Sequence, residues 1–474
     1  MLPDEVLLKI FHFHVNEARY ATDDENGNGK KAMEAWQSLV HVCWRWRSVV
    51  FGSPRRLDLQ LVCSAKTPAR DTVEVWPDLP LVIQDYHCVA SRMDIIISLL
   101  KRSDLVRRIT RITLWHFSSS QSEDLSKAMQ VPFPELTHLD LFHSDQTEPV
   151  VPLSDSFLGG SAPRLRYLEL DGIPYPGLPK LLLSATHLTD LHLYHIPHSG
   201  YISPEAMVAC LSTLTSLELL SLGFKSPLSC PDWERRLPPP LTRTFLPVLG
   251  HLWFKGVVEY LEYLVARIDA PRLECLDITF FNDIMFFTPQ FTRFISNTSI
   301  LEAFDEARIA LDDSTASVKL SSASKLDEGL NVSISCRELD WQLSFLEQVC
   351  TSSLPPLSTL QDLYMSGRPW PQDWKDNIDY EQWQGLLHSF TTVKNLYLSK
   401  ELAPCVVPTL QELVVGSMTE VFPDLQNIFV EELEESGPVQ EGIGKFVFAR
   451  HLTSHRIAVS RWPAGTEARI RTWF

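Results

Sequence analysis

The side chains most able to do chemistry gather in one short stretch, residues 190 to 198, which reads DLHLYHIPH. It contains four residues of the types that bind zinc: Asp190, His192, His195 and His198. A zinc site needs three or four ligands that converge on one point. On a strand, successive side chains alternate between the two faces, so His192 shares a face with Tyr194 while His195 points the other way. We therefore assign no metal site to this stretch.

Sequence motifs for catalysis are also missing. The chain has no G-x-S-x-G elbow and no Gly-rich phosphate or dinucleotide loop, and it contains only 19 glycines. The paired carboxylates Asp312 and Asp313 lie in a Ser-rich stretch typical of a solvated loop. We expect no catalytic residue and no cofactor. A hydrolase would need a triad that no local motif reveals.

Composition narrows the class of protein further. A chain of 474 residues implies several domains or an extended repeat array. The net charge of −17 disfavours nucleic acid as a partner, because phosphates would meet a repulsive field. The sequence has neither a membrane-length apolar run nor a basic leader, and its nine cysteines form no C-x-x-C pair. We expect a protein with reduced thiols, not bound to a membrane, in the cytoplasm or nucleus.

A repeated pattern of the form apolar-x-x-apolar-x-apolar sets the architecture. Seven copies follow one another at intervals of 23 to 32 residues, beginning at Ile109, Leu136, Leu165, Leu188, Leu217, Leu249 and Leu273. The Leu217 copy could also begin at Leu214. Such even spacing predicts strand-turn-helix units that stack to bury their leucines. The pattern resembles leucine-rich repeats, which implies a solenoid with a curved parallel sheet.

The repeats become irregular toward the C-terminus. Weak copies are found at Leu301 and Leu330, and clearer ones begin at Leu360, Val393, Leu410 and Leu425. We expect a strand in each of the clearer copies. The final stretch KFVFARHLTSHRIAVSRW predicts alternating strands that cap the array.

Strand alternation also predicts which side chains lie on the concave face. The outward positions of the strands are rich in aromatic, acidic and His side chains, which suit a protein-binding surface. The full set is Arg111, Thr113, Trp115, His138, Asp140, Phe142, Tyr167, Glu169, Asp171, Asp190, His192, Tyr194, His251, Trp253, Cys275, Asp277, Asp362, Tyr364, Asn395 and Tyr397. As substrate-binding candidates we select Trp115, Phe142, Tyr167, Glu169, Asp190, His192, Tyr194, Trp253, Tyr364 and Tyr397. Many of the others would be ordinary solvated strand positions.

The N-terminal segment predicts two or three short helices. The first helix carries two apolar lines, Val6-Ile10-Phe13 and Leu7-Phe11-Val15, and two apolar faces imply two burial partners. A polar loop follows, and a second helical pattern runs through Leu39, Val42, Cys43 and Trp46 to a stop at Gly52-Ser53-Pro54. A plain helical cap on the next domain is the alternative interpretation.

These residues resemble the F-box of fungal F-box and leucine-rich-repeat proteins. The matching elements are LPDEVLLKIF, with its Leu-Pro-x-Glu start, and LVHVCWRWRSVV, with Val-Cys-x-x-Trp. The resemblance implies that this segment binds a Skp-type adaptor of a cullin ubiquitin ligase. It also implies the contact residues, which are Leu2, Pro3, Val6, Leu7, Ile10, Phe11, Leu39, Val42, Cys43 and Trp46. The inserted loop from Thr22 to Lys31 departs from the family pattern.

The expected fold is α/β, with four segments. They are an F-box-like helical module (1–54), a connector (55–105) with a strand at Arg55–Leu61 and a helix at Val89–Leu100, an irregular leucine-rich-repeat array (106–435) and a C-terminal cap (436–474). The implied function is substrate recognition for an SCF-type ubiquitin ligase, with the array binding a protein substrate. The alternative is a repeat scaffold with no ubiquitin role. The sequence does not identify the substrate.

Overall fold

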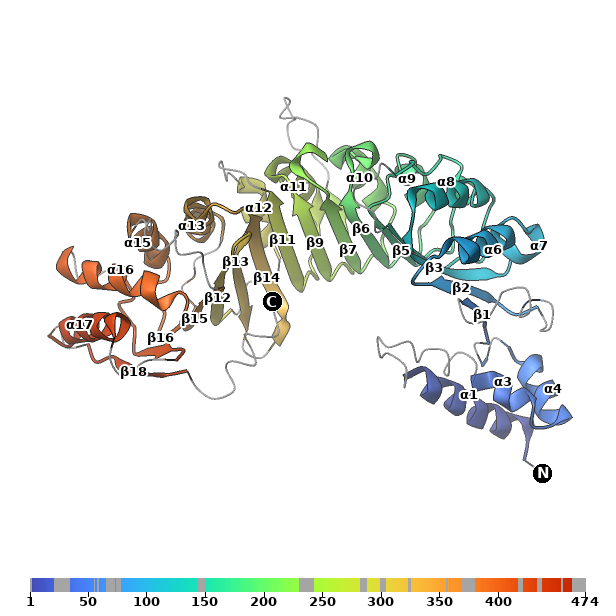
Figure 1. Cartoon of the computed structure of the whole chain (residues 1–474), viewed down its shortest axis with the longest axis horizontal. Coiled ribbons are helices and arrows are strands. Elements are labelled where there is room, and N and C mark those ends of the chain that lie inside the picture. The colour runs from blue at the N-terminus through green and yellow to red at the C-terminus, as the bar shows by residue number, and fades with distance from the viewer. Residues whose placement is uncertain are drawn as a thin grey trace. The chain divides into compact units, whose positions relative to one another are not determined.

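The computed structural model describes most of the chain. The described residues are 2–20, 35–54, 56–57, 59–64, 73, 78–143, 150–229, 243–281, 288–298, 304–322, 325–354, 357, 359–368, 380–416, 421–432, 437–452 and 455–462. The chain divides into two compact units, Met1–Ile202 and Ser203–Phe474 (Figure 1). Each unit combines helices with a largely parallel sheet, so the expected α/β class is confirmed.

Unit 1 begins with a small group of helices, which we call the helical module. It consists of α1 (Asp4–Tyr20), α3 (Ala35–Val40) and α4 (Trp44–Gly52). Asp4 and Glu5 lie in the first turn of α1, where the helix dipole favours negative charge. Cys43 caps α4, because its sulfur accepts a hydrogen bond from the Trp46 amide. The two or three short helices expected here are confirmed.

The rest of unit 1 is a stack of strand-helix repeats. Its strands are β1 (Leu61–Ser64), β2 (Leu81–Asp85), β3 (Ile109–Phe117), β4 (His138–His143), β5 (Tyr167–Asp171) and β6 (Asp190–Ile196). They pair in chain order, and the pairs from β1 to β6 are parallel. The helical segments are α6 (Ala90–Leu100), α7 (Ser103–Val106), α8 (Ser119–Ala128), α9 (Leu178–Leu182) and the 3₁₀ turns η1 (Phe157–Gly160) and η2 (His198–Gly200).

Leucines at alternate strand positions make the core between the strands and the helices. Leu139 and Leu141 in β4 and Leu168 in β5 are completely buried, whereas their neighbours His138 and Tyr167 are half-exposed. Equivalent leucines of adjacent repeats are paired in register, as Leu139 and Leu168 are. The core therefore runs from repeat to repeat, which is the property that the repeated pattern predicts.

Unit 2 continues the same kind of repeat. Its main strands are β7 (Leu219–Phe224), β9 (His251–Gly256), β11 (Cys275–Phe281), β15 (Asp362–Gly367), β16 (Asn395–Leu398), β17 (Asn427–Val430) and β18 (Ala458–Arg461). The helical segments are α10 (Pro204–Leu211), η3 (Pro227–Ser229), α11 (Val258–Val265), α12 (Pro289–Ser296), α13 (Leu339–Gln348), the π-helical turn η5 (Val349–Ser353), α15 (Tyr380–His388), α16 (Ala403–Gly416) and α17 (Pro438–Leu452). Two short strands, β8 (Thr244–Phe245) and β10 (Ile268–Asp269), form a separate parallel pair.

An antiparallel meander interrupts the parallel order of unit 2. It consists of β12 (Glu306–Leu311), β13 (Thr315–Ser322) and β14 (Lys325–Ser335). The last of these strands, β14, pairs with β11, and the first, β12, pairs with β15, so the spatial order is β11-β14-β13-β12-β15. The weak repeat expected at Leu330 is therefore part of this meander, and the one at Leu301 lies outside the described residues.

Several predicted boundaries are corrected by the structure. The segment expected as a strand from Arg55 starts its strand only at Leu61, because the Leu57 and Leu59 amides bond locally to Ser53 and Pro54 carbonyls. The helix expected at Val89–Leu100 is confirmed as α6. For the copy that had two possible starts, the pairing of Leu220 with Leu252 sets the register that begins at Leu217.

Two C-terminal strand predictions are wrong. The Leu410 copy lies in helix α16, where Val406 and Leu410 are buried and continue, at a spacing of four, from the buried Leu402 just before the helix. Residues 445–452 of the expected cap belong to α17, which buries Ile443 and Phe446 on one face. Among the described residues of the expected cap, the strand is β18, residues 458–461. Among the described residues, no helix combines the length and apolarity needed to cross a membrane.

Candidate functional site

The helical module keeps one face of α1 in its interior. Leu7, Phe11 and Val15 are at most 4% exposed, and the Phe11 ring lies 4.7 Å from that of Trp46. Trp36 on α3 is equally buried and donates a hydrogen bond from Nε1 to the Gln60 carbonyl at 3.1 Å, which ties the module to the segment before β1. One of the two predicted apolar lines of α1 is therefore core.

The other apolar line of α1 faces solvent. Its exposed side chains are joined by one from just before α1 and by two from the turn before α4 and its first residue. The set is Leu2 (52% exposed), Val6 (39%), Ile10 (48%), Phe13 (69%), Val42 (59%) and Trp44 (82%). We call these six residues the exposed apolar row. The two parts are held together by Arg45, which bonds to Asp4 at 2.7 Å and to the Leu2 carbonyl. Clustered exposed apolar side chains of this size mark interaction surfaces.

The structure separates the expected adaptor-contact residues into two groups. Leu2, Pro3, Val6, Ile10, Val42 and Cys43 are exposed, and Trp46 is half-buried against Phe11. Leu7, Phe11 and Leu39 are interior residues of the module, which corrects their placement on a contact surface, because a partner cannot reach them. Phe13 and Trp44 are exposed residues that the expected set left out. Phe13 could have been included, since it continues the line of Val6 and Ile10.

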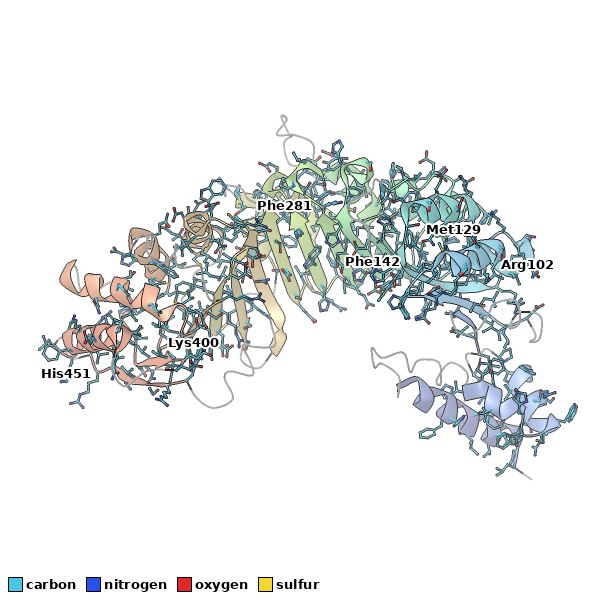
Figure 2. The ribbon with its side chains drawn as sticks, in the orientation of Figure 1. Arg102, Met129, Phe142, Phe281, Lys400 and His451 are labelled. Carbon is cyan, nitrogen blue, oxygen red and sulfur yellow. The ribbon has the colours of Figure 1, made fainter. Side chains whose placement is uncertain are left out.

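In unit 1 the strand positions that alternate with the buried leucines form three rows across β3, β4, β5 and β6. The rows are Arg111-His138-Tyr167-Asp190, Thr113-Asp140-Glu169-His192 and Trp115-Phe142-Asp171-Tyr194. We call this surface the open face of unit 1, and in Figure 2 Phe142 lies on the sheet away from the helices above it. Every unit 1 residue expected on the concave face is found in these rows. Thr113 and Asp140 are nearly buried.

Aromatic and histidine rings cover much of the open face. The rings of His138 and Tyr167 stack at 4.1 Å and 10°, and Tyr167 lies 5.2 Å from His192. His192 Nδ1 is 2.9 Å from the Tyr194 hydroxyl. Burial lowers the pKa of His138 to about 4 and also lowers that of His192. Both imidazoles are therefore neutral at pH 7 and act as flat, uncharged contact surfaces.

Carboxylates lie among these rings. Asp140 accepts a hydrogen bond from Trp115 Nε1 at 2.9 Å, and Glu169 accepts one from the Tyr167 hydroxyl. Burial and the neighbouring charge of Glu169 raise the pKa of Asp140 to about 7. Its carboxyl is thus only partly ionised near neutral pH.

The side chains of the histidine-rich stretch 190–198 do not converge on one point. His195 has a left-handed backbone (φ 49°), and its Nδ1 lies 2.7 Å from Asp171 Oδ1. This backbone turn brings His195 to the open face, which corrects the expectation that it points the other way. Asp190 accepts a hydrogen bond from the Thr189 hydroxyl at 2.6 Å. Among the described residues there is no group of three or more side chains placed to hold a metal ion.

Unit 2 has an open face of its own. The expected residues Trp253, Asp277, Tyr364 and Tyr397 occupy one row, which also contains Ser221, Asn331, Lys319, Arg308, Phe429 and Ser460. His251 and Cys275 lie in the row beside it, as Asp362 and Asn395 do further along. Asn331 donates to Asp277 at 3.0 Å.

The last repeats of unit 2 form a ladder of stacked rings. Tyr397 stacks on Tyr364 at 4.2 Å and on Phe429 at 4.6 Å, and the Arg308 guanidinium lies 5.0 Å from the centroid of the Tyr364 ring. Tyr364 is only 7% exposed, so it supports the ladder and offers little surface to a substrate. Sequence reasoning missed Phe429, which the Leu425 copy could have revealed. It also missed Arg308, which lies in the meander and follows no repeat.

A parallel ladder of amides runs beside the rings. Asn427 donates to Asn395 Oδ1 at 2.7 Å, and Asn395 donates to Asp362 Oδ1 at 2.6 Å. Burial raises the pKa of Asp362, and the Asn395 hydrogen bond opposes that effect. The two ladders fix the side chains of this surface, as a preformed binding face requires.

Comparisons with known proteins give limited similarity. No protein-family model and no curated protein matches the chain. Among solved structures, the leucine-rich repeat-containing protein LegL7 from Legionella pneumophila aligns at 13% identity over 71% of this chain and 90% of that chain, with a TM-score of 0.27. A TLR13–ssRNA13 complex aligns at 11% identity over 84% of this chain and 48% of that chain, with a TM-score of 0.30. With TM-scores this low, the description of the fold rests on the stacked strands themselves.

Proposed function

We propose that this chain is the substrate-recognition subunit of an SCF-type, cullin-based ubiquitin ligase. In this proposal the helical module binds a Skp-type adaptor, and the open faces of the repeats bind a protein substrate. The chain forms no covalent bond to its substrate and uses no cofactor. Its contribution to catalysis is to hold the substrate near the partner enzymes.

The observation that carries the proposal is the exposed apolar row. A helix that needed only to cap the first repeat would bury one apolar face, which Leu7, Phe11 and Val15 already supply. The second face, around Val6, Ile10 and Phe13, has no covering element among the described residues of the module. Leaving such side chains in water is unfavourable, and a docked partner removes that cost. Four of the six residues of the row, Leu2, Val6, Ile10 and Val42, are also residues that carry the F-box resemblance.

Co-purification with a Skp-type adaptor tests the proposal. The wild-type chain should retain the adaptor, and Ile10→Asp should lose it, because burying an unpaired carboxylate costs several kcal/mol, roughly enough to abolish a micromolar complex. His14→Asp is the matched control: His14 is exposed on the same helix outside the row and should leave binding unchanged.

Each outcome has a clear meaning. Retention by wild type and His14→Asp together with loss in Ile10→Asp supports the ligase function. Failure of the wild-type chain to bind the adaptor overturns it and leaves a repeat scaffold with no ubiquitin role.

A further inference from the structure

The open face of unit 1 concentrates negative charge at one place. Asp140 on β4 is paired in register with Glu169 on β5, and Asp171 lies two residues further along β5. Glu169 and Asp171 both act electrostatically on Asp140. The rings of Trp115 and Tyr167 lie beside these carboxylates, as their hydrogen bonds to Asp140 and Glu169 show. We call these five residues the acidic–aromatic cluster.

Asp140 is an unusual member of this cluster. Its side chain is 6% exposed, and Trp115 Nε1 bonds to Oδ2 only. No described residue donates a hydrogen bond to Oδ1. Buried polar atoms nearly always have a partner, so an unpaired carboxylate oxygen needs an explanation. A donor supplied by a bound molecule would provide one.

The surrounding groups leave the cluster with an excess of negative charge. Arg111 on β3 is the nearby cation that acts on Asp140. His138 and His192 are uncharged at pH 7 for the reasons given above, and His195 is engaged with Asp171. One guanidinium thus faces three carboxyl groups; Glu169 is partly exposed, and the Asp171 side chain is 15% exposed.

We infer that the acidic–aromatic cluster binds an arginine side chain of the protein recognised by this chain. The inference rests on the proposed function, because it names the chemistry by which the open face would recognise its substrate. The guanidinium would bond to Glu169 and Asp171 and supply a donor toward Asp140 Oδ1, with a shift of a neighbouring ring to admit it.

The chemistry of the cluster favours arginine over other cations. A guanidinium is planar, presents several donors in a fixed fork, and stacks on aromatic faces. Trp115 provides an aromatic surface within the same cluster. Tyr167, which stacks on His138, would offer its ring edge or a face made accessible by a shift of His192. A lysine ammonium offers neither the fork nor the stacking plane, and the described carboxylates form no group suited to a metal ion.

The test uses two pools of fluorescent heptapeptides that are random except for the one central residue. One pool has arginine at that position, and the other has citrulline, which keeps the shape of arginine but lacks its charge. Binding to the full-length chain is measured by fluorescence anisotropy without any adaptor. We expect the arginine pool to bind at least about tenfold more tightly than the citrulline pool.

Variants of the chain test which residues cause the preference for arginine over citrulline. Glu169→Gln and Asp171→Asn should each reduce the ratio between the two pools severalfold. Asp94→Asn is the control, because Asp94 is an exposed carboxylate on helix α6 of unit 1 and lies outside the open face. It should leave the ratio unchanged. Circular dichroism verifies that each variant is folded.

Equal affinity for the two pools, including no binding of either, would overturn the inference. So would an arginine preference that survives the Glu169→Gln, Asp171→Asn double variant. Because the adaptor is absent from this assay, failure of the arginine preference is distinct from failure of adaptor binding. A chain that retains the adaptor but shows no preference would keep the proposed function and lose this inference alone.

Discussion

Asp140 is a carboxyl group that the folded chain keeps away from water. Its pKa of about 7 in the folded state compares with 3.8 in the unfolded state. Between these values the folded chain binds more protons than the unfolded chain, so this residue makes stability fall as pH rises through the window. Well above pH 7 the free-energy cost of burying the ionised Asp140 carboxyl reaches its full value.

Asp140→Asn should therefore stabilise the protein in a pH-dependent way. The amide carries no charge at any pH and can still accept the Trp115 hydrogen bond. We expect a gain in unfolding free energy of about 2 to 4 kcal/mol at pH 8, from roughly 1.4 kcal/mol per pKa unit, and almost none at pH 4. Thermal unfolding at the two pH values measures this. A gain of equal size at both would show that ionisation of Asp140 is not the cause.

Tyr397 is the central ring of the C-terminal ladder, with Tyr364 on one side and Phe429 on the other. Tyr397→Ala removes both stacking contacts and should destabilise the last repeats by about 1 to 3 kcal/mol. Amide hydrogen exchange should speed up in β16 and β17. Tyr397→Phe keeps the ring and should leave exchange close to that of the wild type. Equal acceleration in both variants would assign the effect to the hydroxyl instead.

At the scale of secondary-structure elements, α1 provides two phenylalanines with opposite environments. Phe11 is completely buried against Trp46, whereas Phe13 is 69% exposed. Phe11→Ala should cost about 3 to 5 kcal/mol of stability in the helical module, and Phe13→Ala should change stability by less than about 0.5 kcal/mol. Limited proteolysis of the module, followed by mass spectrometry, compares them. Equal susceptibility would contradict the assignment of the two faces.

The meander depends on one glycine of β14. Gly329 has φ +147°, and a Cβ atom added there would lie 2.3 Å from the Leu320 carbonyl oxygen. Gly329→Ala should therefore force the β13–β14 pair apart and lower the thermal midpoint by several degrees. Gly250→Ala is the control, because its added Cβ would come no closer than 3.9 Å to the Glu218 carbonyl oxygen. A midpoint unchanged by Gly329→Ala would mean that the strand pair relaxes freely.

The sequence predicted secondary-structure elements correctly where a segment fits only one hydrophobic spacing, that of a strand or that of a helix. The Leu136 and Leu165 copies have leucines at alternate positions and no competing helical spacing, and both are strands with the predicted register. The Leu410 copy satisfies the strand pattern and also a spacing of four with Leu402 and Val406, and helix packing decided between them. Local sequence does not encode that choice, because tertiary contacts make it.

The meander and the acidic–aromatic cluster show why other features of the fold and the site could not be predicted from the sequence. β12 contacts β15 and β14 contacts β11 through pairings between residues up to 56 positions apart, such as Glu306 with Asp362. The weak copy at Leu330 does not reveal this order, and β12 and β13 follow no copy. The aromatic and acidic residues of the open face were predicted from alternation alone. The left-handed turn at His195 and the unpaired Oδ1 of Asp140 depend on atomic geometry that spacing does not determine.

For the whole molecule, the net charge of −17 predicts that two binding events respond differently to salt. Capture of arginine peptides should weaken severalfold between about 50 and 500 mM NaCl, because salt screens the attraction between opposite charges. Adaptor binding through the exposed apolar row should change little, since burial of apolar surface depends weakly on screening. Titrations of each partner across this range measure both. A parallel loss of the two would indicate that the adaptor surface is also electrostatic.

The reversed strand order of the meander has a consequence for synthesis on the ribosome. Parallel repeats can be added one by one as the chain emerges, because each new strand finds the previous one already in place. At β12 this growth must stop, since β12 joins the sheet on the β11 side only through β13 and β14, which are made after it. The nascent chain therefore keeps the β11 edge of the sheet unpaired until residue 335 emerges. Strands β14, β13 and β12 then add to that edge together. Assembly of the molecule is stepwise on both sides of that point and concerted across it.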